Sequence, residues 1–221
     1  MTKAERIEKM KEDLARMTQI EKELYAAGHE GREVNIIAGM DEVGRGPLAG
    51  PVVTAAVVLP RDFDLLGVND SKKLTEKRRE EMYKKIMDCA IEVNIGIRDN
   101  MEIDRVNILN ATKEAMADAV NGLKKRPDVV LIDALTIEGT DVPQIGIVKG
   151  DAKSVSIAAA SIIAKVTRDH MMIDYAEKYP GYAFENNKGY GTKAHYEGLD
   201  RLGPCPIHRR SFLVKYFENK K

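Results

Sequence analysis

Acidic residues follow three apolar segments that have the character of β-strands. The acids are Asp41, Glu42, Asp133 and Asp151. Ligands of open α/β sheets bind beyond the strand ends. Close carboxylates repel one another there by about 4 kcal/mol per pair at an effective dielectric of about 20, so cations or protons must neutralise them. Because oxygen ligands without histidine or cysteine suit hard cations, the acids predict a Mg²⁺ or Mn²⁺ site, not a zinc site.

Asp41 and Glu42 are adjacent, and on a regular strand their side chains would point to opposite faces. Both can serve one metal centre only if the strand distorts, or if one of them ligates through water or the backbone. The glycines that follow make distortion easy. Taken singly, each acid is better explained as a turn residue or a strand end beside water. Their recurrence at three strand ends favours a shared site.

A loop with three glycines and a proline spans residues 44–50. It superficially resembles a dinucleotide-binding fingerprint, but that fingerprint requires a helix next. Here Pro47 and a β-branched segment follow, and the two preceding acids would repel phosphate. The loop would let the backbone approach another ligand closely, with Arg45 as a phosphate or packing contact. An ordinary turn explains the loop equally well.

The region 186–221 is basic and is interleaved with aromatic residues such as Tyr190. Its eight lysines and arginines exceed its three acids by five charges, whereas the whole chain has 35 of each kind and no net charge. This pattern suits a nucleic-acid backbone and its sugars or bases, although basic tails are also common solvated surfaces. Lys72 is a further candidate phosphate contact or a solvated lysine. Beside a carboxylate centre, the pattern favours metal-dependent chemistry on a polyanion.

The composition is that of a folded protein with one domain and an appendage. The chain has 221 residues, of which 43% are hydrophobic and 32% charged. Two cysteines exclude a disulfide scaffold and a zinc cluster, and they favour a reducing compartment. We expect a cytoplasmic protein without membrane contact, because no apolar run is long enough to span a bilayer and the N-terminus lacks signal-peptide character.

Hydrophobic patterning predicts five strands and three main helices. The strands are expected at 34–40, 51–59, 91–97, 129–132 and 144–148, and the helices at 74–90, 101–123 and 154–179. The first half of the last helix is apolar on nearly all sides, which predicts burial against a sheet. A hairpin followed by alternating strands and helices predicts an α/β fold with a mixed sheet covered by helices.

The first thirty residues form a predicted amphipathic helix outside this pattern. Its apolar positions recur every three or four residues, and Gly28 and Gly31 bracket its end. We therefore divide the chain into a helical extension, 1–33, and a globular domain, 34–221. The apolar stripe is more simply explained by packing than by a partner-binding arm. The chain is expected to fold and work without residues 1–30.

Several segments together resemble the motifs of the type 2 ribonucleases H, and specifically those of bacterial ribonuclease HII. These segments are 41–52, 69–74, 130–133, 149–151, 159–169, 188–195 and 206–212. The likeness runs from about Ile37 to Phe212, with the motifs in the family order. The first thirty residues lie outside it.

The resemblance implies a ribonuclease H-like five-stranded sheet with a helical C-terminal region. It also implies two-metal hydrolysis on the 5′ side of a ribonucleotide in RNA–DNA hybrids or duplex DNA, leaving 3′-hydroxyl and 5′-phosphate, by a monomer that removes misincorporated ribonucleotides with Mn²⁺ or Mg²⁺. The four acids would be the catalytic ligands. The substrate-binding residues would be Gly44, Arg45, Gly46, Tyr190 and Lys72. Asp169 is a rival of Asp151 for the fourth acid.

Two alternatives remain open. The chain could bind RNA–DNA hybrids without cutting them, although four acids in the family pattern argue against this. It could also be a ribonuclease HIII-like enzyme that needs runs of RNA. Arg45 in place of lysine in the glycine loop, and the lack of a large N-terminal domain, favour ribonuclease HII.

Overall fold

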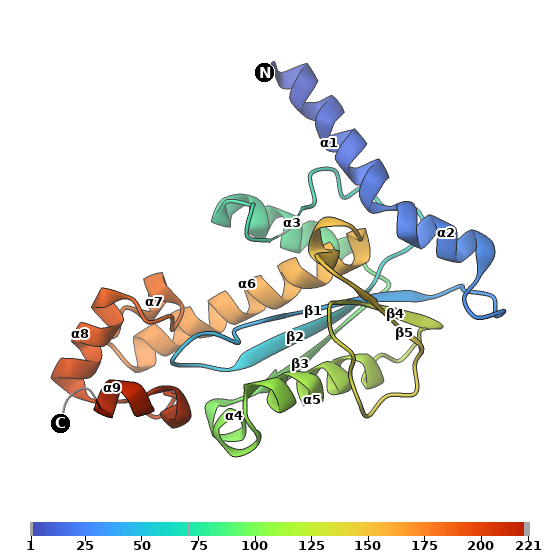
Figure 1. The fold of residues 1–221 in the computed structure, drawn as a ribbon. Coiled ribbons are helices and arrows are strands. Elements are labelled where there is room, and N and C mark those ends of the chain that lie inside the picture. Colours follow the sequence, from blue (N-terminus) through green and yellow to red (C-terminus); the bar gives the residue numbers. More distant parts are fainter. Residues whose placement is uncertain (1, 70, 219–221) are drawn as a thin grey trace.

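A mixed five-stranded sheet forms the centre of the protein (Figure 1). The structure is a computed structural model that describes residues 2–69 and 71–218. The strands are β1 (Ile37–Val43), β2 (Val52–Val58), β3 (Glu92–Arg98), β4 (Val129–Asp133) and β5 (Gln144–Ile147), in the order β3-β2-β1-β4-β5. β1, β2 and β3 pair antiparallel, whereas β1, β4 and β5 pair parallel. The predicted α/β fold with a hairpin and a mixed sheet is confirmed.

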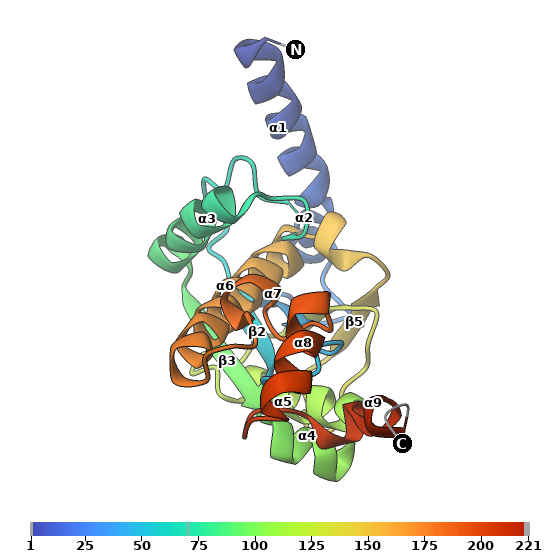
Figure 2. The same ribbon diagram turned by 90° about the vertical axis from the view of Figure 1, so that its left-hand side faces the viewer.

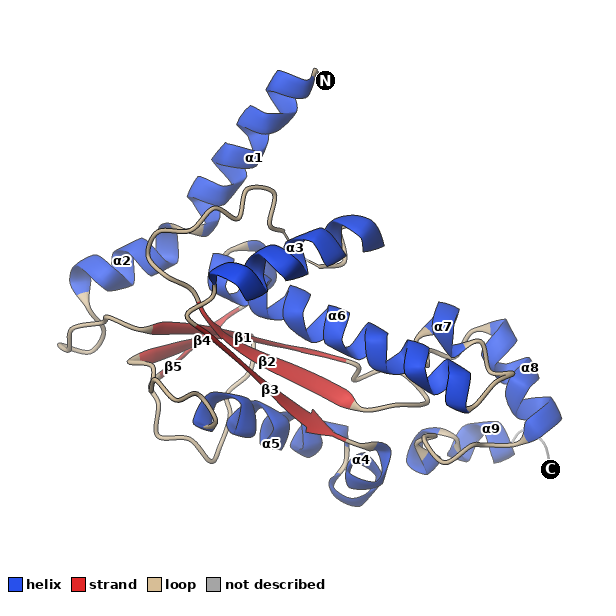
Figure 3. Ribbon diagram, turned by 180° about the vertical axis from the view of Figure 1, so that it is seen from behind, coloured by secondary structure: helices blue, strands red, loops and turns tan. Residues whose placement is uncertain are grey.

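Helices cover both faces of the sheet (Figure 3). α6 (Val155–Lys178) and α3 (Glu76–Cys89) lie on one face, and α4 (Asn100–Val106) and α5 (Ile108–Asn121) lie on the other. The first half of α6 is buried, as its apolar sequence predicts. It lies directly on β1, where a side chain at Gly39 would come within 2.0 Å of the Ser156 carbonyl carbon.

The single helix expected at 101–123 is divided in two at Asn107. This residue has φ +69° and therefore cannot continue α4. Its side-chain oxygen accepts hydrogen bonds from the amides of Leu109 and Asn110, which caps α5. Asparagine tolerates the left-handed region better than most residues. The capping signal at Asn107 therefore outweighs the continuous apolar pattern.

The N-terminal extension also contains two helices in place of one. These are α1 (Lys3–Met17) and α2 (Gln19–Ala27), with Thr18 between them. The first part of α1 projects away from the domain (Figures 1 and 2), whereas Leu14 and Met17 near its end pack against the core. α2 lies against the domain, where Ile20, Leu24 and Tyr25 pack on buried residues of β1, β4 and α6.

The C-terminal region packs at the far end of α6 (Figure 2). It contains α7 (Phe184–Asn187), α8 (Lys193–Leu202), the short 3₁₀ turn η2 (Arg210–Phe212) and α9 (Val214–Glu218). Another 3₁₀ turn, η1 (Gly150–Ala152), lies before α6. Asp70 of the second motif and Lys220 and Lys221 of the basic region lie outside the described residues. Within the described chain, no helix combines the length and the apolar character needed to cross a bilayer.

Candidate active site

Asp41 and Asp133 are neighbours on two adjacent parallel strands. β1 begins and ends three residues later than expected, so Asp41 lies within the strand and not beyond it. Met40 of β1 is in register with Ile132 of β4, and the next residue of each strand is an aspartate. Since side chains alternate along a strand, both aspartates point to the face that α6 covers.

The Asp41 carboxyl group is buried, with 6% of the residue exposed. Its Oδ1 accepts a hydrogen bond from the Glu42 amide at 2.8 Å. Burial raises its pKa to about 8, and the charges of Glu42 and Asp133 act in the same direction. A contact with the Ser161 hydroxyl acts in the opposite direction. With a pKa of about 8, Asp41 is mainly protonated at neutral pH.

Glu42 points to the opposite face of β1. The strand stays in register with β2 as far as Val43, so the distortion expected at these acids does not occur within the strand. Glu42 Oε1 lies 3.4 Å from a guanidinium nitrogen of Arg45. Burial raises the Glu42 pKa, the Arg45 charge lowers it, and the Asp133 charge raises it. Asp133 thus acts on both Asp41 and Glu42, and the three carboxylates form one electrostatic cluster.

Asp151 reaches this cluster from the turn between β5 and α6. It lies in η1 and is 7% exposed. The amide of the preceding Gly150 donates to Asp133 Oδ1 at 2.9 Å, which joins the turn to the end of β4. Lys72 Nζ lies 4.0 Å from Asp151 Oδ2. The structure therefore places Asp41 and Asp133 side by side, with Glu42 on the other face of β1, and joins the turn of Asp151, with Lys72 beside it, to Asp133.

Asp169 is engaged elsewhere on α6. Its Oδ1 accepts a hydrogen bond from Lys165 Nζ, one turn earlier, at 2.6 Å. This ion pair is largely buried, and burial lowers the Lys165 pKa while Asp169 raises it. Of the two rivals for the fourth acid, Asp151 is the one whose turn is bonded to Asp133.

The donor set fits a divalent cation by its chemistry. All four acids supply hard oxygen ligands. The charges of Glu42 and Asp133 raise the pKa of Asp41, and the charge of Asp133 raises the pKa of Glu42. In the part of the chain that the structure describes, no three acidic, histidine or cysteine side chains already stand close enough to hold a metal. A cation held by these acids would require the carboxylates to move closer together.

The glycine loop and Tyr190 adjoin each other beside the acids. The loop connects β1 to β2, and a side chain at Gly46 would meet the Tyr190 ring at 3.5 Å. The Tyr190 side chain is 46% exposed and available for stacking. Among the described residues, no hydrogen bond uses the amide groups of Arg45 and Gly46. The predicted substrate-binding residues thus present free backbone donors next to an exposed aromatic ring.

Two buried arginines hold the glycine loop from the protein interior. Sequence analysis gave neither of them a role in the loop. Arg168 on α6 and Arg209 near the C-terminus are fully buried. The Arg209 guanidinium donates hydrogen bonds of 2.6–3.0 Å to the carbonyl oxygens of Gly44, Arg45, Pro47 and Gly50. The Arg168 guanidinium donates at 2.8–3.1 Å to those of Ala49, Pro51 and Lys188.

Arg209 is one of the eight basic residues counted in region 186–221, but because it is fully buried it does not add to the basic surface of that region. Burial lowers its pKa to about 9, and that of Arg168 to about 10, so both guanidinium groups remain charged at neutral pH. The loop carbonyls point inward to these charges, and the amides of Leu48 and Gly50 donate to the carbonyl oxygens of Gly189 and Ile207, so the amides of Arg45 and Gly46 are the ones left to face a ligand. The sequence signal was present, because both arginines lie in family motifs, but motif membership does not distinguish a buried arginine from a surface one.

His195 and His208 also lie in the basic region, and both are buried. The Cys205 amide donates to His208 Nδ1 at 2.9 Å, and His195 Nδ1 lies 2.9 Å from the Tyr190 carbonyl oxygen. These backbone groups assign the direction of the central bond, in which His208 Nε2 donates to His195 Nε2 at 2.9 Å. Burial lowers the pKa of both rings, that of His208 to about 4. The neutral pair therefore anchors the backbone of Tyr190.

Comparison with known proteins identifies the family of the chain. Residues 38–215 match the family described as Ribonuclease HII. A ribonuclease HII of Ligilactobacillus salivarius (strain UCC118) is 56% identical over 207 residues, which make up 94% of this chain and 79% of that protein. The ribonuclease H2 of Pyrococcus horikoshii OT3 is 29% identical, with a TM-score of 0.70 over 84% of this chain and 98% of that one.

A more distant solved structure shares the fold alone. Bst-RNase HIII in complex with Mn²⁺ is 20% identical, with a TM-score of 0.60 over 80% of this chain and 64% of that one. The sequence match covers every predicted site residue, since all of them lie between Asp41 and Tyr190. The chain therefore belongs to the ribonuclease HII family and is a ribonuclease H, an enzyme of the hydrolase class.

Proposed function

We propose that this enzyme hydrolyses the phosphodiester on the 5′ side of a ribonucleotide, both in RNA–DNA hybrids and in duplex DNA with single embedded ribonucleotides. The products would carry 3′-hydroxyl and 5′-phosphate ends. The observation that carries the proposal is the cluster of Asp41, Glu42 and Asp133 beside Asp151. A buried group of carboxylates persists only when cations or protons neutralise it, and hard oxygen ligands suit a divalent cation.

The four acids would hold two divalent cations, Mn²⁺ or Mg²⁺, which activate a water molecule and stabilise the leaving 3′-oxygen. Asp41 loses its proton when the centre is loaded. Lys72, with its side chain 79% exposed beside Asp151, would contact a phosphate of the bound strand. Arg45 is tied to Glu42 and so links the glycine loop to the acids.

Substrate choice would depend on the loop and on Tyr190. The amides of Arg45 and Gly46 suit the oxygen of a 2′-hydroxyl, which distinguishes RNA from DNA. Tyr190 would stack on the neighbouring sugar. Because this arrangement reads one 2′-hydroxyl, one ribonucleotide in DNA would suffice, and removal of misincorporated ribonucleotides is the proposed role.

The proposed active species is a monomer, because the acids, the loop and Tyr190 all come from one chain. The proposed compartment is the cytoplasm. Cys89 and Cys205 form no disulfide with each other, and in that compartment they would stay reduced. Light scattering on the active fraction should give one chain per particle. A dimer as the only active species would contradict the first proposal.

End-labelled duplex DNA with one ribonucleotide tests the proposed reaction. With Mn²⁺ or Mg²⁺ the enzyme should nick it on the 5′ side of the ribonucleotide, and Asp41→Asn should abolish cleavage while duplex binding stays within about threefold. Cleavage restricted to long hybrids would favour the ribonuclease HIII-like alternative. Binding without cleavage of either substrate would favour the non-cutting alternative.

A further inference from the structure

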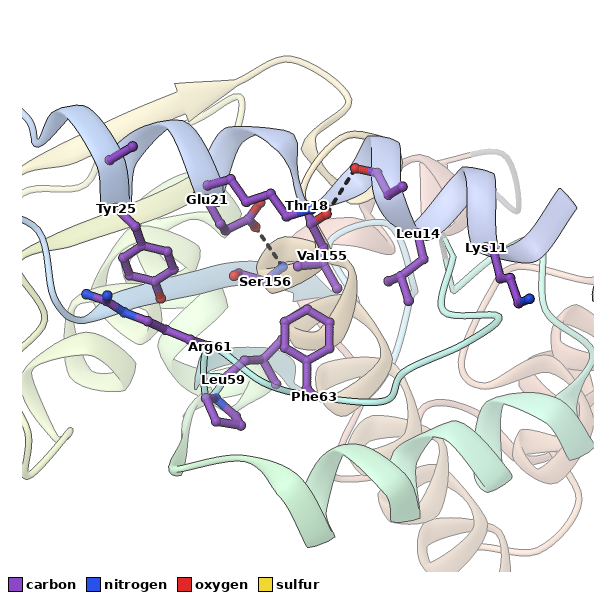
Figure 4. Close-up of a pocket in the computed structure, with 14 residues that line it drawn as sticks. Lys11, Leu14, Thr18, Glu21, Tyr25, Leu59, Arg61, Phe63, Val155 and Ser156 are labelled. Atoms are coloured by element: carbon purple, nitrogen blue, oxygen red, sulfur yellow. Dashed lines mark hydrogen bonds between the residues drawn. The ribbon is translucent and has the colours of Figure 1, made fainter. Parts of the chain in front are cut away.

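Glu21 is a buried carboxylate outside the catalytic cluster. It lies on α2 in the N-terminal extension, before the part of the chain that matches the family, and it is 5% exposed. Its Oε1 accepts a hydrogen bond from Ser154 Oγ at 2.5 Å and another from the Ser156 amide at 3.1 Å. Figure 4 shows the second of these bonds, from α2 to the first turn of α6. The extension thus contacts the N-terminus of the most buried helix with a negative charge, which the helix dipole favours.

Ser154 connects Glu21 to the turn that carries Asp151. As the N-cap of α6, it accepts a hydrogen bond from the Ile157 amide at 3.2 Å. Its own amide donates to the Gly150 carbonyl at 2.8 Å. The Gly150 amide in turn donates to Asp133. A short series of hydrogen bonds therefore leads from Glu21 to the positions of Asp133 and Asp151.

The pocket beside Glu21 leaves these hydrogen bonds as a main contact between α2 and the start of α6. A pocket of about 610 Å³ opens between α1, α2 and the segment after β2, and it is lined by Leu14, Phe63 and Val155 (Figure 4). The junction of α2 with α6 is therefore not closed by continuous apolar packing on this side. Glu21 Oε2 is buried without a hydrogen-bond partner among the described residues, so Oε1 accepts both of the bonds by which this side chain joins α2 to α6.

We propose that Glu21 is a positioning residue, which fixes the junction of η1 and α6 and thereby sets Asp151 for cation binding. This inference rests on the proposed role of Asp151 as a metal ligand. α2 is itself held in place, because the Arg61 guanidinium lies 4.4 Å from the centre of the Tyr25 ring and also donates to Asn35. The extension is then part of the support of the metal centre.

Cation affinity measured without nucleic acid tests the proposal. In isothermal titration with Mn²⁺, Glu21→Ala should raise the Kd about tenfold, as the loss of a group that orients a ligand does in other metal sites. The Mn²⁺ concentration that gives half-maximal cleavage should rise by the same factor, with kcat at saturating Mn²⁺ nearly unchanged. Glu21→Gln keeps the accepting oxygen and should stay within about threefold of the wild type.

Glu23→Ala is the matched control on the same helix, because Glu23 is exposed and accepts a hydrogen bond from Gln19 on α2 itself. It should leave the Mn²⁺ Kd unchanged. If Glu21→Ala does not fold, Glu21→Asp, which withdraws the carboxylate from Ser154, should raise the Kd by an intermediate factor. A lowered Tm with an unchanged Mn²⁺ Kd in Glu21→Ala or Glu21→Asp would overturn the proposal.

Asp151→Asn separates this inference from the proposed function. If Asp151→Asn binds Mn²⁺ as tightly as the wild type, the assignment of the ligand itself is wrong. If Asp151→Asn loses affinity while the Glu21 variants do not, Asp151 stands and the role of Glu21 is refuted. Faster amide hydrogen exchange across 149–154 in Glu21→Ala, but not in Glu23→Ala, would support the positioning role directly.

Discussion

At the scale of single residues, burial determines the chemistry of Asp41. The metal-free carboxyl group has a pKa of about 8, far above its usual 3.8, because water cannot solvate its charge and Glu42 repels it. If Asp41 is a metal ligand, as proposed, a proton and a metal ion compete for this group at neutral pH.

This competition predicts how cleavage depends on pH. At low Mn²⁺ concentration the rate should rise with pH up to about 8, and a tenfold increase in Mn²⁺ should move the acid limb down by up to about one pH unit, because one proton is displaced. Since the folded-state pKa exceeds the unfolded value, the metal-free fold should also lose stability as pH rises from 3.8 to about 8, and a cation should restore it. Rate profiles at two Mn²⁺ concentrations that superimpose would contradict the prediction.

Tyr190→Ala tests recognition of the single ribonucleotide. Stacking on a nucleic acid contributes roughly 1–3 kcal/mol by alanine substitution, so cleavage at one embedded ribonucleotide should fall about tenfold or more. Cleavage of a long hybrid should fall less, because other ribonucleotides remain available in other registers. Lys215→Ala, a change at a peripheral charge, should weaken both reactions equally. The two kcat/KM values for each variant give the comparison, and equal losses for Tyr190→Ala would refute the stacking role.

At the scale of elements, the glycine loop depends on two helices distant in sequence from it. Arg168 on α6 and Arg209 beside η2 supply the hydrogen bonds that turn the loop carbonyls inward. The loop sequence by itself specifies only flexibility, with Gly44 at φ +95° and Gly50 at φ +84°. Its shape comes from the guanidinium groups packed behind it.

Arg209→Lys should therefore damage the loop while keeping the charge. Lysine offers three donors at one point in place of a planar fork, so some carbonyls of the loop would lose their partners. Each unsatisfied buried group costs about 1–3 kcal/mol, which a fall in Tm should register. Cleavage at single ribonucleotides should fall more than tenfold, with duplex binding changed far less. Normal cleavage by Arg209→Lys would show that the loop holds its shape unaided.

The sequence predicted elements where one local signal dominated. The sheet, its hairpin and the buried helix α6 followed from apolar runs, and the acids stood out because each follows such a run. The break at Asn107 was missed because a local cap competes with a continuous apolar pattern. The roles of Arg168 and Arg209 were inaccessible, because a basic residue bound to backbone carbonyls and one bound to phosphate look alike in a sequence.

At the scale of the whole molecule, the N-terminal extension has two parts with different roles. The expectation that residues 1–30 are dispensable remains untested. In the structure these residues form two parts with different contacts to the domain. α1 is largely exposed up to Lys9, whereas α2 packs on the domain and carries Glu21.

Deletion of residues 2–9 should leave Tm and the Mn²⁺ dependence of cleavage nearly unchanged. Deletion of residues 2–27 should remove the contacts of Ile20, Leu24 and Tyr25, lower Tm and raise the Mn²⁺ requirement at least tenfold, for the reason given for Glu21. Thermal unfolding and metal titration of both shortened chains give the comparison. If the chain without α2 has the Tm and the Mn²⁺ requirement of the wild type, the whole extension is dispensable and the prediction is wrong.

The bond between Arg209 and the Gly44 carbonyl spans 165 positions of the chain. During synthesis the acids and the glycine loop leave the ribosome well before this partner does. The nascent chain therefore carries the four acids before Arg209 can order the glycine loop. We expect a product that ends before Arg209 to lack the ordered loop and, under the proposed function, to cleave poorly at single ribonucleotides.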